Sequence, residues 1–431
     1  MPFYSCHSRT SLDTKLRRRG FFKLAGAAVA GAASTQLANE AYLTPSRLLE
    51  AHEDCQKLVD EQQRYWTAKA STLQQEIDAL NEKLVKTAGF HDEFGVPDRL
   101  VAATYMTFWD ILDPHTLAGR WKDQGAAYTP ILGQYSSSDR AAITYHLNWA
   151  LRSGIRSMCL EFGWIRPNSP FDIVARESFL EHDLMRHMTF SILYHPDAVT
   201  GTEWSIGPKA LYDDFSFLAT NYFNHRGSLK VDGRILATVL NLPWYWRDFG
   251  IENTNNLLRD LKNRIRTEYG YDLFLVGEVW PNSDPSFLDD PKLPIDGILH
   301  WGDLWGTLEA NSVTYDKYVT KYANHWKKWS SLTKKRGLHY IPCIYPGFDD
   351  KPAADSGVVK EHHYIERNPE EFYQILQIAK EVTTPPLDMI ILFTWNDFHE
   401  GTSIEPTKEY GFTYLDIVRK TFVEDYLVAK D

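Results

Sequence analysis

Short, mainly hydrophobic runs recur along the chain from about residue 96 onward, and amphipathic segments separate them. Eight runs have the length of buried strands: Val101–Phe108, Ile155–Phe162, Thr189–Tyr194, Ile235–Leu240, Leu273–Val279, Gly297–His300, Tyr340–Ile344 and Met389–Thr394. Runs that are hydrophobic throughout, rather than at alternate positions, are typical of strands buried on both faces of a parallel sheet. The pattern therefore predicts eight parallel strands.

Helical periodicity fills nearly all of the intervals between these runs. The predicted helices lie near Ser138–Arg152, Phe171–His187, Lys209–Arg226, Asn253–Glu268, Tyr315–Lys335 and Pro369–Val382, with another after Leu415. The interval between Val279 and Gly297 has no obvious helical pattern. Strands that alternate with helices predict a closed α/β barrel, a (β/α)8 TIM barrel, over residues 96–431.

The segment before the barrel, residues 39–95, is predicted to be a helical extension. Between Pro45 and Lys86, hydrophobic side chains recur every three or four positions, at Trp66, Ala70, Leu73, Ile77, Leu80 and Leu84. Such a stripe is typical of helices that pack against another helix. We expect segment 45–86 either to dock on its own barrel or to mediate self-association.

The first 38 residues have the pattern of an export signal. The basic segment Arg17–Lys23 precedes a mildly hydrophobic, alanine-rich run from Leu24 to Ala33. This order resembles a twin-arginine signal peptide, which predicts a periplasmic or extracellular protein. Because the run is shorter than the roughly 20 residues that span a bilayer, we expect no membrane span in the mature protein. The alternative is a basic tail followed by an alanine-rich helix.

Charge and residue spacing narrow the range of partners. The formal net charge of −11 is unfavourable for binding nucleic acid, so we expect no such partner. The four cysteines do not have the spacing of a zinc site, and the adjacent pair His362-His363 points to opposite sides on a regular element. No glycine-rich phosphate loop is evident in the sequence. We therefore predict neither a metal nor a cofactor.

Polar and aromatic residues follow the predicted strands directly. In a barrel of this kind the active site lies at the carboxyl ends of the strands, where side chains from different strands meet. Residues at these positions that we predict to bind substrate are His195, Asn241, Glu278, Trp301, Tyr345, Asp350, Asn396 and His399. Glu161 either belongs to this site or is a satisfied barrel carboxylate. A site rich in carboxylates and aromatic rings indicates a carbohydrate ligand, although the rings are equally compatible with core packing.

Asp397 and Glu400 are the predicted catalytic residues. On one helical turn, a separation of three residues places the two Cβ atoms roughly 5–6 Å apart on the same face. Cleavage of a glycosidic bond uses one carboxyl group as acid and another as base or nucleophile, and repulsion between neighbouring carboxylates raises the pKa of one of them. The alternative is a purely structural role, in which Asp397 caps a helix and Glu400 lies in its first turn.

Three stretches of the sequence resemble motifs of a known family. They are TWNDFHEGTSIEPTKEYGFTYLD at Thr394–Asp416, PILGQYSSSD at Pro130–Asp139, and YPGFDD at Tyr345–Asp350. The motifs are similar to those of the endo-α-mannosidase-like glycoside hydrolases of family 99 and of the related WbsX-type proteins of polysaccharide gene clusters. The likeness extends over about Leu100 to Asp416.

The resemblance implies a (β/α)8 barrel that cleaves α-mannosidic linkages internally and with retention. It implies that Asp397 assists the sugar's own 2-hydroxyl as this attacks the anomeric carbon, and that Glu400 acts first as general acid and then as base. The sequence departs from the family by carrying Asp397 where Glu is expected and Phe398 where Trp is usual. Because Asp is one methylene shorter, its carboxylate falls short by more than about 1 Å unless the backbone compensates. Two alternatives remain open: a WbsX-type protein of polysaccharide assembly, and a carbohydrate-binding barrel without activity.

Overall fold

The computed structural model describes residues 94–110, 121, 125–163, 167–195, 208–301, 312–357 and 359–424, together with Lys57 and Arg64. The chain divides into two compact units, Met1–Thr87 and Ala88–Asp431. The predicted export signal and nearly all of the predicted helical extension lie outside the described residues, although Lys57 and Arg64 are both helical. The barrel belongs to the second unit.

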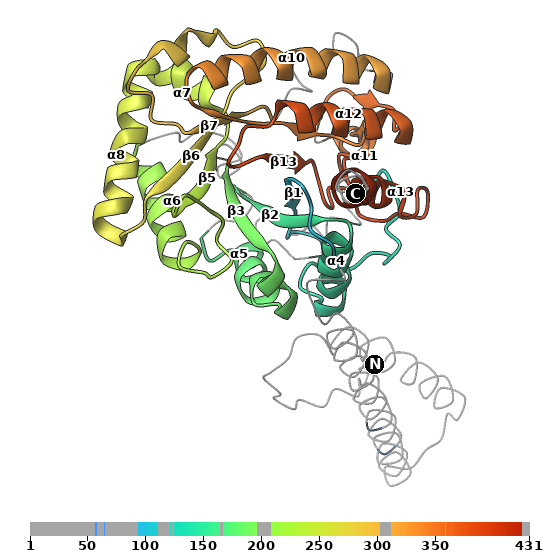
Figure 1. The fold of residues 1–431 in the computed structure, drawn as a ribbon. Helices are drawn as coiled ribbons and strands as arrows, with labels where there is room; N and C mark the ends of the chain where they lie inside the picture. The colour runs from blue at the N-terminus through green and yellow to red at the C-terminus, as the bar shows by residue number, and fades with distance from the viewer. Residues whose placement is uncertain are drawn as a thin grey trace, which may run out of the picture. The chain divides into compact units, whose positions relative to one another are not determined.

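Parallel strands form a barrel at the centre of this unit (Figure 1). They are β1 (Leu100–Tyr105), β2 (Ile155–Phe162), β3 (Thr189–Tyr194), β5 (Arg234–Val239), β6 (Leu273–Glu278), β7 (Gly297–Leu299), β9 (His339–Ile341), β10 (Cys343–Ile344) and β13 (Met389–Leu392). Their order in the sheet is β10-β13-β1-β2-β3-β5-β6-β7-β9. Every predicted hydrophobic run overlaps one of these strands, and the run at 340–344 overlaps two, so the predicted (β/α)8 barrel is confirmed.

A proline divides the strand that closes the barrel. β9 pairs with β7 and β10 pairs with β13, and only Pro342 separates β9 from β10. Proline has no N–H to donate to a neighbouring strand. Its carbonyl still accepts a hydrogen bond from the Ile391 N–H at 3.0 Å. β9 and β10 therefore act as one interrupted strand, and the sheet closes on itself as eight strands.

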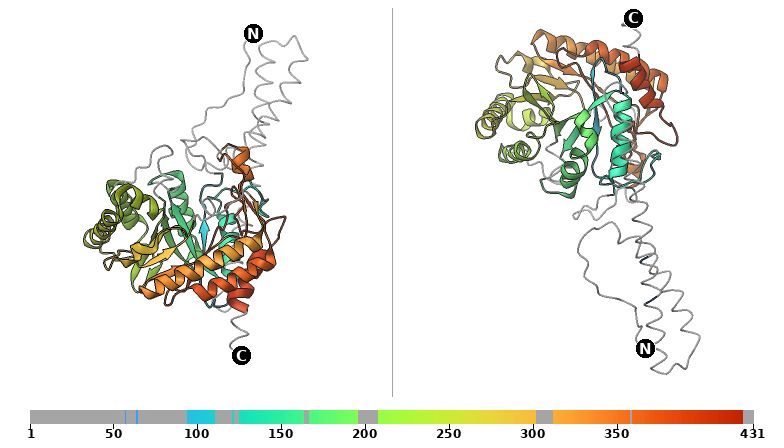
Figure 2. Two further views of the ribbon diagram at one scale, coloured as in Figure 1. Left: turned by 90° about the horizontal axis from the view of Figure 1, so that it is seen from above. Right: turned by 60° about the horizontal axis from the view of Figure 1, so that its bottom comes forward.

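Helices surround the strands in Figure 1 and in the two further views of Figure 2. Those that follow barrel strands are α4 (Arg140–Arg152), α6 (Pro208–Asn221), α8 (Ile251–Tyr269), α10 (Tyr315–Lys335), α12 (Pro369–Val382) and α13 (Thr413–Arg419). The predicted helix Phe171–His187 is divided into α5 (Pro170–Ile173), the π-helix η1 (Val174–Leu180) and the 3-10 helix η2 (Asp183–His187). Between β6 and β7 there is only the 3-10 helix η3 (Pro285–Asp289), in agreement with the missing helical pattern.

Side-chain caps and a proline determine where two of these helices begin. Asp139 precedes α4 and accepts a hydrogen bond from the Ala141 N–H at 2.9 Å. Asn368 precedes α12 and accepts one from the Glu370 N–H at 3.1 Å. Pro369 occupies the first position of α12, where its missing N–H would have no partner in the helix anyway. Local chemistry thus starts both helices where the periodic pattern predicts them.

A second, three-stranded sheet lies beside the segment that follows β13. Its strands are β11 (Phe348–Asp349), β12 (Tyr364–Ile365) and β8 (Ser312–Val313), in the order β11-β12-β8. The Asp349 N–H donates a hydrogen bond to the Glu400 carbonyl at 2.8 Å. The remaining short elements are β4 (Lys230–Val231), α7 (Leu242–Phe249), α11 (Lys351–Asp355) and η4 (Lys420–Glu424). Within the described ranges, no helix combines the length and apolar character needed to cross a membrane.

Candidate active site

The carboxyl ends of the barrel strands bring together side chains that are far apart in the sequence. The predicted site residues at or just beyond these ends are His195 after β3, Asn241 after β5, Glu278 in β6, Trp301 after β7, Tyr345 after β10 and Asp397 after β13. Glu161, whose role the sequence left open, lies near the end of β2. Because all of these strands are parallel, their carboxyl ends lie at one end of the barrel.

Four of these residues form a chain of polar contacts across neighbouring strands. The Asn241 N–H donates to Glu278 Oε2 at 2.5 Å, and Asn241 Nδ2 lies 3.3 Å from His195 Nε2. His195 Nδ1 lies 3.7 Å from Glu161 Oε1. Asn241 has a left-handed backbone with φ of 58°, a conformation that Asn adopts more readily than most residues. The contacts hold Glu161 within the site rather than as a separate barrel carboxylate.

Aromatic rings lie beside this polar chain. The ring of Trp301 is stacked near that of His195, with centroids 6.2 Å apart, and meets the Phe393 ring edge-on at 3.9 Å. Tyr345 is buried, and its hydroxyl donates to the Trp301 carbonyl at 2.6 Å. Trp301 is half-buried, whereas Trp280, just after β6, is 40% exposed. Tyr345 therefore supports Trp301, and Trp280 presents its ring to solvent.

The segment after β13 forms a turn, so the predicted helical spacing of Asp397 and Glu400 is wrong. Residues 398–401 are in turn conformation and no helix begins there. Asp397 Oδ1 accepts hydrogen bonds from the N–H groups of His399 at 3.0 Å and Glu400 at 3.1 Å. The Asp397 N–H donates to Thr394 Oγ1 at 2.7 Å. Asp397 thus caps a turn, which fixes its carboxylate close to the main chain of Glu400.

Burial and neighbouring charges both act on the Glu400 carboxyl group. Burial raises the pKa of the Glu400 carboxyl well above its usual range, and the negative charges of Asp397, Glu161 and Asp350 raise it further. Each of these effects disfavours the ionised form. A carboxyl group that holds its proton near neutral pH can serve as a general acid.

Asp350 lies inside the protein, where it acts on Glu400 by its charge. Its side chain is fully buried, and Oδ1 accepts a hydrogen bond from the His363 N–H at 2.6 Å. His363 Nδ1 lies 3.0 Å from Asp350 Oδ2. The neighbouring pair is similar but more exposed, with His362 Nε2 2.9 Å from Asp349 Oδ1. These contacts argue against the direct substrate contact predicted for Asp350, because both carboxylate oxygens already meet His363.

Asn396 and His399 are also more deeply buried than the sequence suggested. Asn396 Oδ1 accepts from the Met106 N–H at 2.7 Å, while Nδ2 donates to the Met106 carbonyl at 3.0 Å and lies 3.2 Å from the Tyr135 hydroxyl. His399 is only 7% exposed. The Asn396 side chain therefore joins the β13 segment to the end of β1, which argues for positioning rather than substrate contact.

A buried polar network that sequence reasoning missed stabilises the same segment. Glu405 Oε2 accepts from the Tyr135 hydroxyl at 2.7 Å, and Glu405 Oε1 lies 3.3 Å from His146 Nε2. His146 Nδ1 in turn lies 3.0 Å from the hydroxyl of Tyr105. The side chains of His146 and Glu405 have no solvent exposure. Tyr135 lies in the motif at Pro130–Asp139, and Glu405 lies in the motif at Thr394–Asp416. The presence of both motifs in one chain was therefore the sequence signal for this network.

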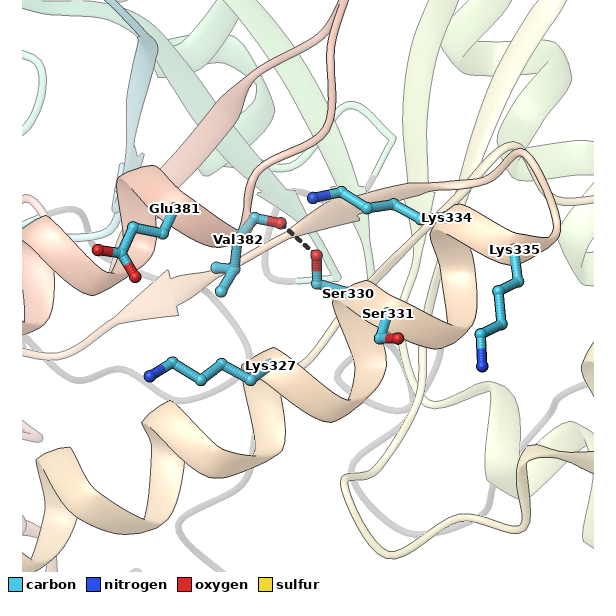
Figure 3. A pocket seen from close by; sticks show the side chains of 7 residues that line it. All are labelled: Lys327, Ser330, Ser331, Lys334, Lys335, Glu381 and Val382. Carbon is cyan, nitrogen blue, oxygen red and sulfur yellow. Dashed lines mark hydrogen bonds between the residues drawn. The ribbon is translucent and has the colours of Figure 1, made fainter.

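Two cavities differ in their relation to this site. One of about 500 Å³ lies between α10 and α12, and Figure 3 shows its lining of Lys327, Ser330, Ser331, Lys334, Lys335, Glu381 and Val382. These residues lie toward the carboxyl ends of both helices, which lead into the amino-terminal ends of β9 and β13. Another cavity, of about 470 Å³, is lined by Asp349 and Lys351 among others, next to the Glu400 turn. Neither cavity is lined by Glu161, Asp350, Asp397 or Glu400, but the second includes Asp349, which is bonded to the Glu400 carbonyl.

The fold and the site together define a class of protein, a (β/α)8 barrel with acidic and aromatic residues at the carboxyl ends of its strands. Among the residues that the structure describes, no group of three or more His, Cys, Asp or Glu side chains could hold a metal ion. Residues 296–418 match the family model described as glycosyltransferase WbsX. The match covers the last strands of the barrel and the Glu400 turn.

Two comparisons extend this likeness. The chain is 23% identical over 305 residues to the glycoprotein endo-α-1,2-mannosidase of Mus musculus and 22% identical over 310 residues to that of Rattus norvegicus. Each match covers 68% of this chain but 60% of the relative's length. The fold resembles a glycoside hydrolase-like protein with a TM-score of 0.57 at 17% identity, over 76% of this chain and 94% of the other. It also resembles the family 99 endo-α-mannosidase of Bacteroides thetaiotaomicron, with a TM-score of 0.55 at 15% identity, over 78% and 98%.

Proposed function

We propose that the protein is a glycoside hydrolase that cleaves α-linked, mannan-type polysaccharides or oligosaccharides. The observation that carries the proposal is the pair of carboxyl groups in the turn after β13, where Asp397 Oδ1 accepts the Glu400 N–H at 3.1 Å and the Asp397 charge helps to raise the pKa of Glu400. The similarity to endo-α-mannosidases supports the choice of an α-mannosidic linkage.

In the proposed reaction, Glu400 and Asp397 move protons in opposite directions. Glu400 donates its proton to the leaving glycosidic oxygen, while Asp397 accepts the proton of the sugar 2-hydroxyl as that oxygen attacks the anomeric carbon. Water then opens the resulting ring: Glu400 accepts a proton from the water, and Asp397 returns its proton to the 2-oxygen. Two inversions at the anomeric carbon give retention. The two N–H groups that hold Asp397 Oδ1 orient the carboxylate for this exchange.

The test is direct. Purified protein is incubated with a set of α-linked mannan oligosaccharides, and released products are identified by mass spectrometry. We expect cleavage by the wild type and cleavage about 1,000-fold slower by a folded Glu400→Gln variant. Cleavage by this variant at the wild-type rate would show that another group is the acid.

A WbsX-type glycosyltransferase is the second candidate, because the family model of that description matches residues 296–418. A transferase of this kind requires an activated sugar donor. If the protein elongates a glycan only when a nucleotide sugar is added, this alternative replaces the hydrolase. Binding of glycan without any product, even after long incubation, would instead identify a carbohydrate-binding barrel.

We further propose that the protein is exported by the twin-arginine route to the periplasm or beyond, because the segment Arg17–Lys23 precedes an alanine-rich run. Replacing both Arg18 and Arg19 by Lys should leave the protein in the cytoplasm, as measured by cell fractionation. Unchanged export would contradict the signal.

Self-association through segment 45–86 is a separate proposal. It is tested by comparing the mass in solution of the mature protein with that of a variant in which Leu73, Ile77 and Leu80 are replaced by Ser.

A further inference from the structure

A buried arginine lies behind the turn that carries Glu400. Arg367 follows β12 by two positions and is 7% exposed. Its Nη2 donates to the Gly401 carbonyl at 2.9 Å and to the Ser403 carbonyl at 2.5 Å. One guanidinium nitrogen therefore connects two carbonyl groups on the carboxyl side of Glu400.

Three tyrosine rings surround this guanidinium group. Arg367 Cζ lies 4.3 Å from the ring centroid of Tyr128, 5.0 Å from that of Tyr414 and 5.3 Å from that of Tyr410. Ring faces attract a cation, and the attraction is stronger where water is excluded. The charge is thus stabilised by carbonyl oxygens and ring faces, which restrict where the guanidinium can lie.

The same turn also packs against β11 (Phe348–Asp349). Gly401 has a φ of 60°, and a Cβ added there would come within 2.9 Å of Asp349 Cβ and 3.0 Å of the Asp349 main-chain nitrogen. A Cβ at Gly347 would come within 2.5 Å of Arg367 Cγ. The two glycines therefore permit the close packing of β11, the turn and Arg367.

We propose that Arg367 is a positioning residue of the active site, which fixes the main chain from which Glu400 extends toward the glycosidic oxygen. The inference rests on the proposed role of Glu400 as general acid. Arg367 itself does not contact the reacting atoms. Its effect follows from the precision that proton transfer requires, since a misplacement of about 1 Å can lower a rate about 100-fold.

Arg156 provides a matched control at the opposite end of the barrel. It lies near the start of β2 and donates to the carbonyls of Leu151 at 2.7 Å, Gly95 at 2.6 Å and Phe94 at 3.2 Å. Like Arg367, it cross-links main-chain carbonyls, although its side chain is half-buried and that of Arg367 is buried. It differs in lying at the amino-terminal end of the strands, away from Glu400.

The experiment compares Arg367→Ala with Arg156→Ala at a temperature at which circular dichroism finds both folded. We expect Arg367→Ala to lower kcat about 100-fold with little change in KM, and Arg156→Ala to retain the wild-type kcat. Millimolar guanidinium ion should restore part of the kcat of Arg367→Ala by reoccupying the space between the tyrosines. Equal losses of kcat in the two variants, or a wild-type kcat in folded Arg367→Ala, would overturn the proposal.

A second measurement does not depend on activity. Hydrogen–deuterium exchange in the absence of glycan should become faster in segment 395–405 of Arg367→Ala and remain unchanged in segment 94–100. Arg156→Ala should give the reverse pattern. If the wild type cleaves no glycan, the proposed hydrolase function fails while exchange still tests the positioning. Unchanged exchange at 395–405 in Arg367→Ala would refute the positioning role whatever the activity.

Discussion

The carboxylates at the two ends of the barrel have opposite kinds of neighbours. At the amino-terminal end, Asp296 precedes β7, and its carboxylate lies 2.5 Å from Arg234 Nη1 and 2.8 Å from Lys262 Nζ. Asp98 precedes β1 and pairs with Lys380 at 2.9 Å. These carboxylates meet cations and stabilise the ends of strands.

At the carboxyl-terminal end, carboxylates gather near one another instead. The charges of Asp397, Glu161 and Asp350 all act on Glu400. Asp397 and Asp350 meet main-chain N–H groups and an imidazole. Like charges in a buried site raise the free energy of the ionised fold, so this end gives up stability for a perturbed proton equilibrium. The difference separates an end whose carboxylates pair with cations from one whose carboxylates act on one another.

Among the variants considered, Glu400→Gln should cause the largest loss of activity. Loss of the general acid is expected to lower kcat about 1,000-fold, because positioned proton transfer contributes on this order. The measurement is the initial rate of product release from an α-mannan oligosaccharide. Glu405→Gln is an unsuitable control because it disrupts a buried network. Glu381→Gln, at an exposed residue, is the control instead.

The same variant should alter how stability depends on pH. Since the pKa of Glu400 is raised in the fold, the folded state binds this proton more tightly than the unfolded state does. Wild-type stability therefore falls as pH rises from the ordinary glutamate range toward the raised pKa. Glu400→Gln lacks this titration, so its free energy of unfolding relative to wild type should increase with pH. Urea unfolding at mildly acidic and mildly alkaline pH measures the trend, and parallel pH curves would contradict it.

Asp296→Asn tests the opposite end. The change removes the negative charge that faces Arg234 and Lys262, and weakens acceptance of the Leu275 N–H at 2.9 Å. We expect the free energy of unfolding to fall by roughly 1–3 kcal/mol, with kcat unchanged where the variant is folded. Urea denaturation and initial rates give the two values. A loss of activity without a loss of stability in Asp296→Asn would contradict the stabilising role of this end.

Asp350→Asn should change the pH dependence of activity. Removing the Asp350 charge lowers the pKa of Glu400, because that charge helps to raise it. Since a general acid must be protonated, the alkaline limb of the kcat/KM profile should move to lower pH. Asp349→Asn, at the adjacent residue paired with His362, should leave the limb in place. Equal shifts in both variants would be inconsistent with a specific effect of Asp350.

The eight strands could be predicted because each lies in a short, mainly hydrophobic run, a pattern that depends only on neighbours in sequence. The missing helix between β6 and β7 was visible for the same reason. The turn at 398–401 was not, since a spacing of three residues suits one helical turn and an isolated turn equally. The glycine at position 401 was the local sign in the sequence that the chain does not continue as a helix. In the structure this residue has a φ of 60°.

Other parts of the site depend on contacts with no local pattern. Asn396 meets Met106, which lies 290 positions earlier in the chain. Arg367 is a single cation whose partners come from three distant segments. Asp350 could be recognised as part of a motif, but its pairing with His363 depends on how β11 and β12 meet. Sequence patterns thus indicate where the site lies, whereas tertiary packing decides which side chains contact a substrate.

The place of β13 in the sheet affects the order in which the molecule can be completed. β13 pairs with β1 on one side and with β10 on the other. A chain that ends before Met389 therefore leaves β1 and β10 as two open sheet edges, which invite pairing with other chains. The proposed catalytic residues Asp397 and Glu400 come five and eight positions after β13, so one stretch of chain both closes the sheet and supplies the acidic turn.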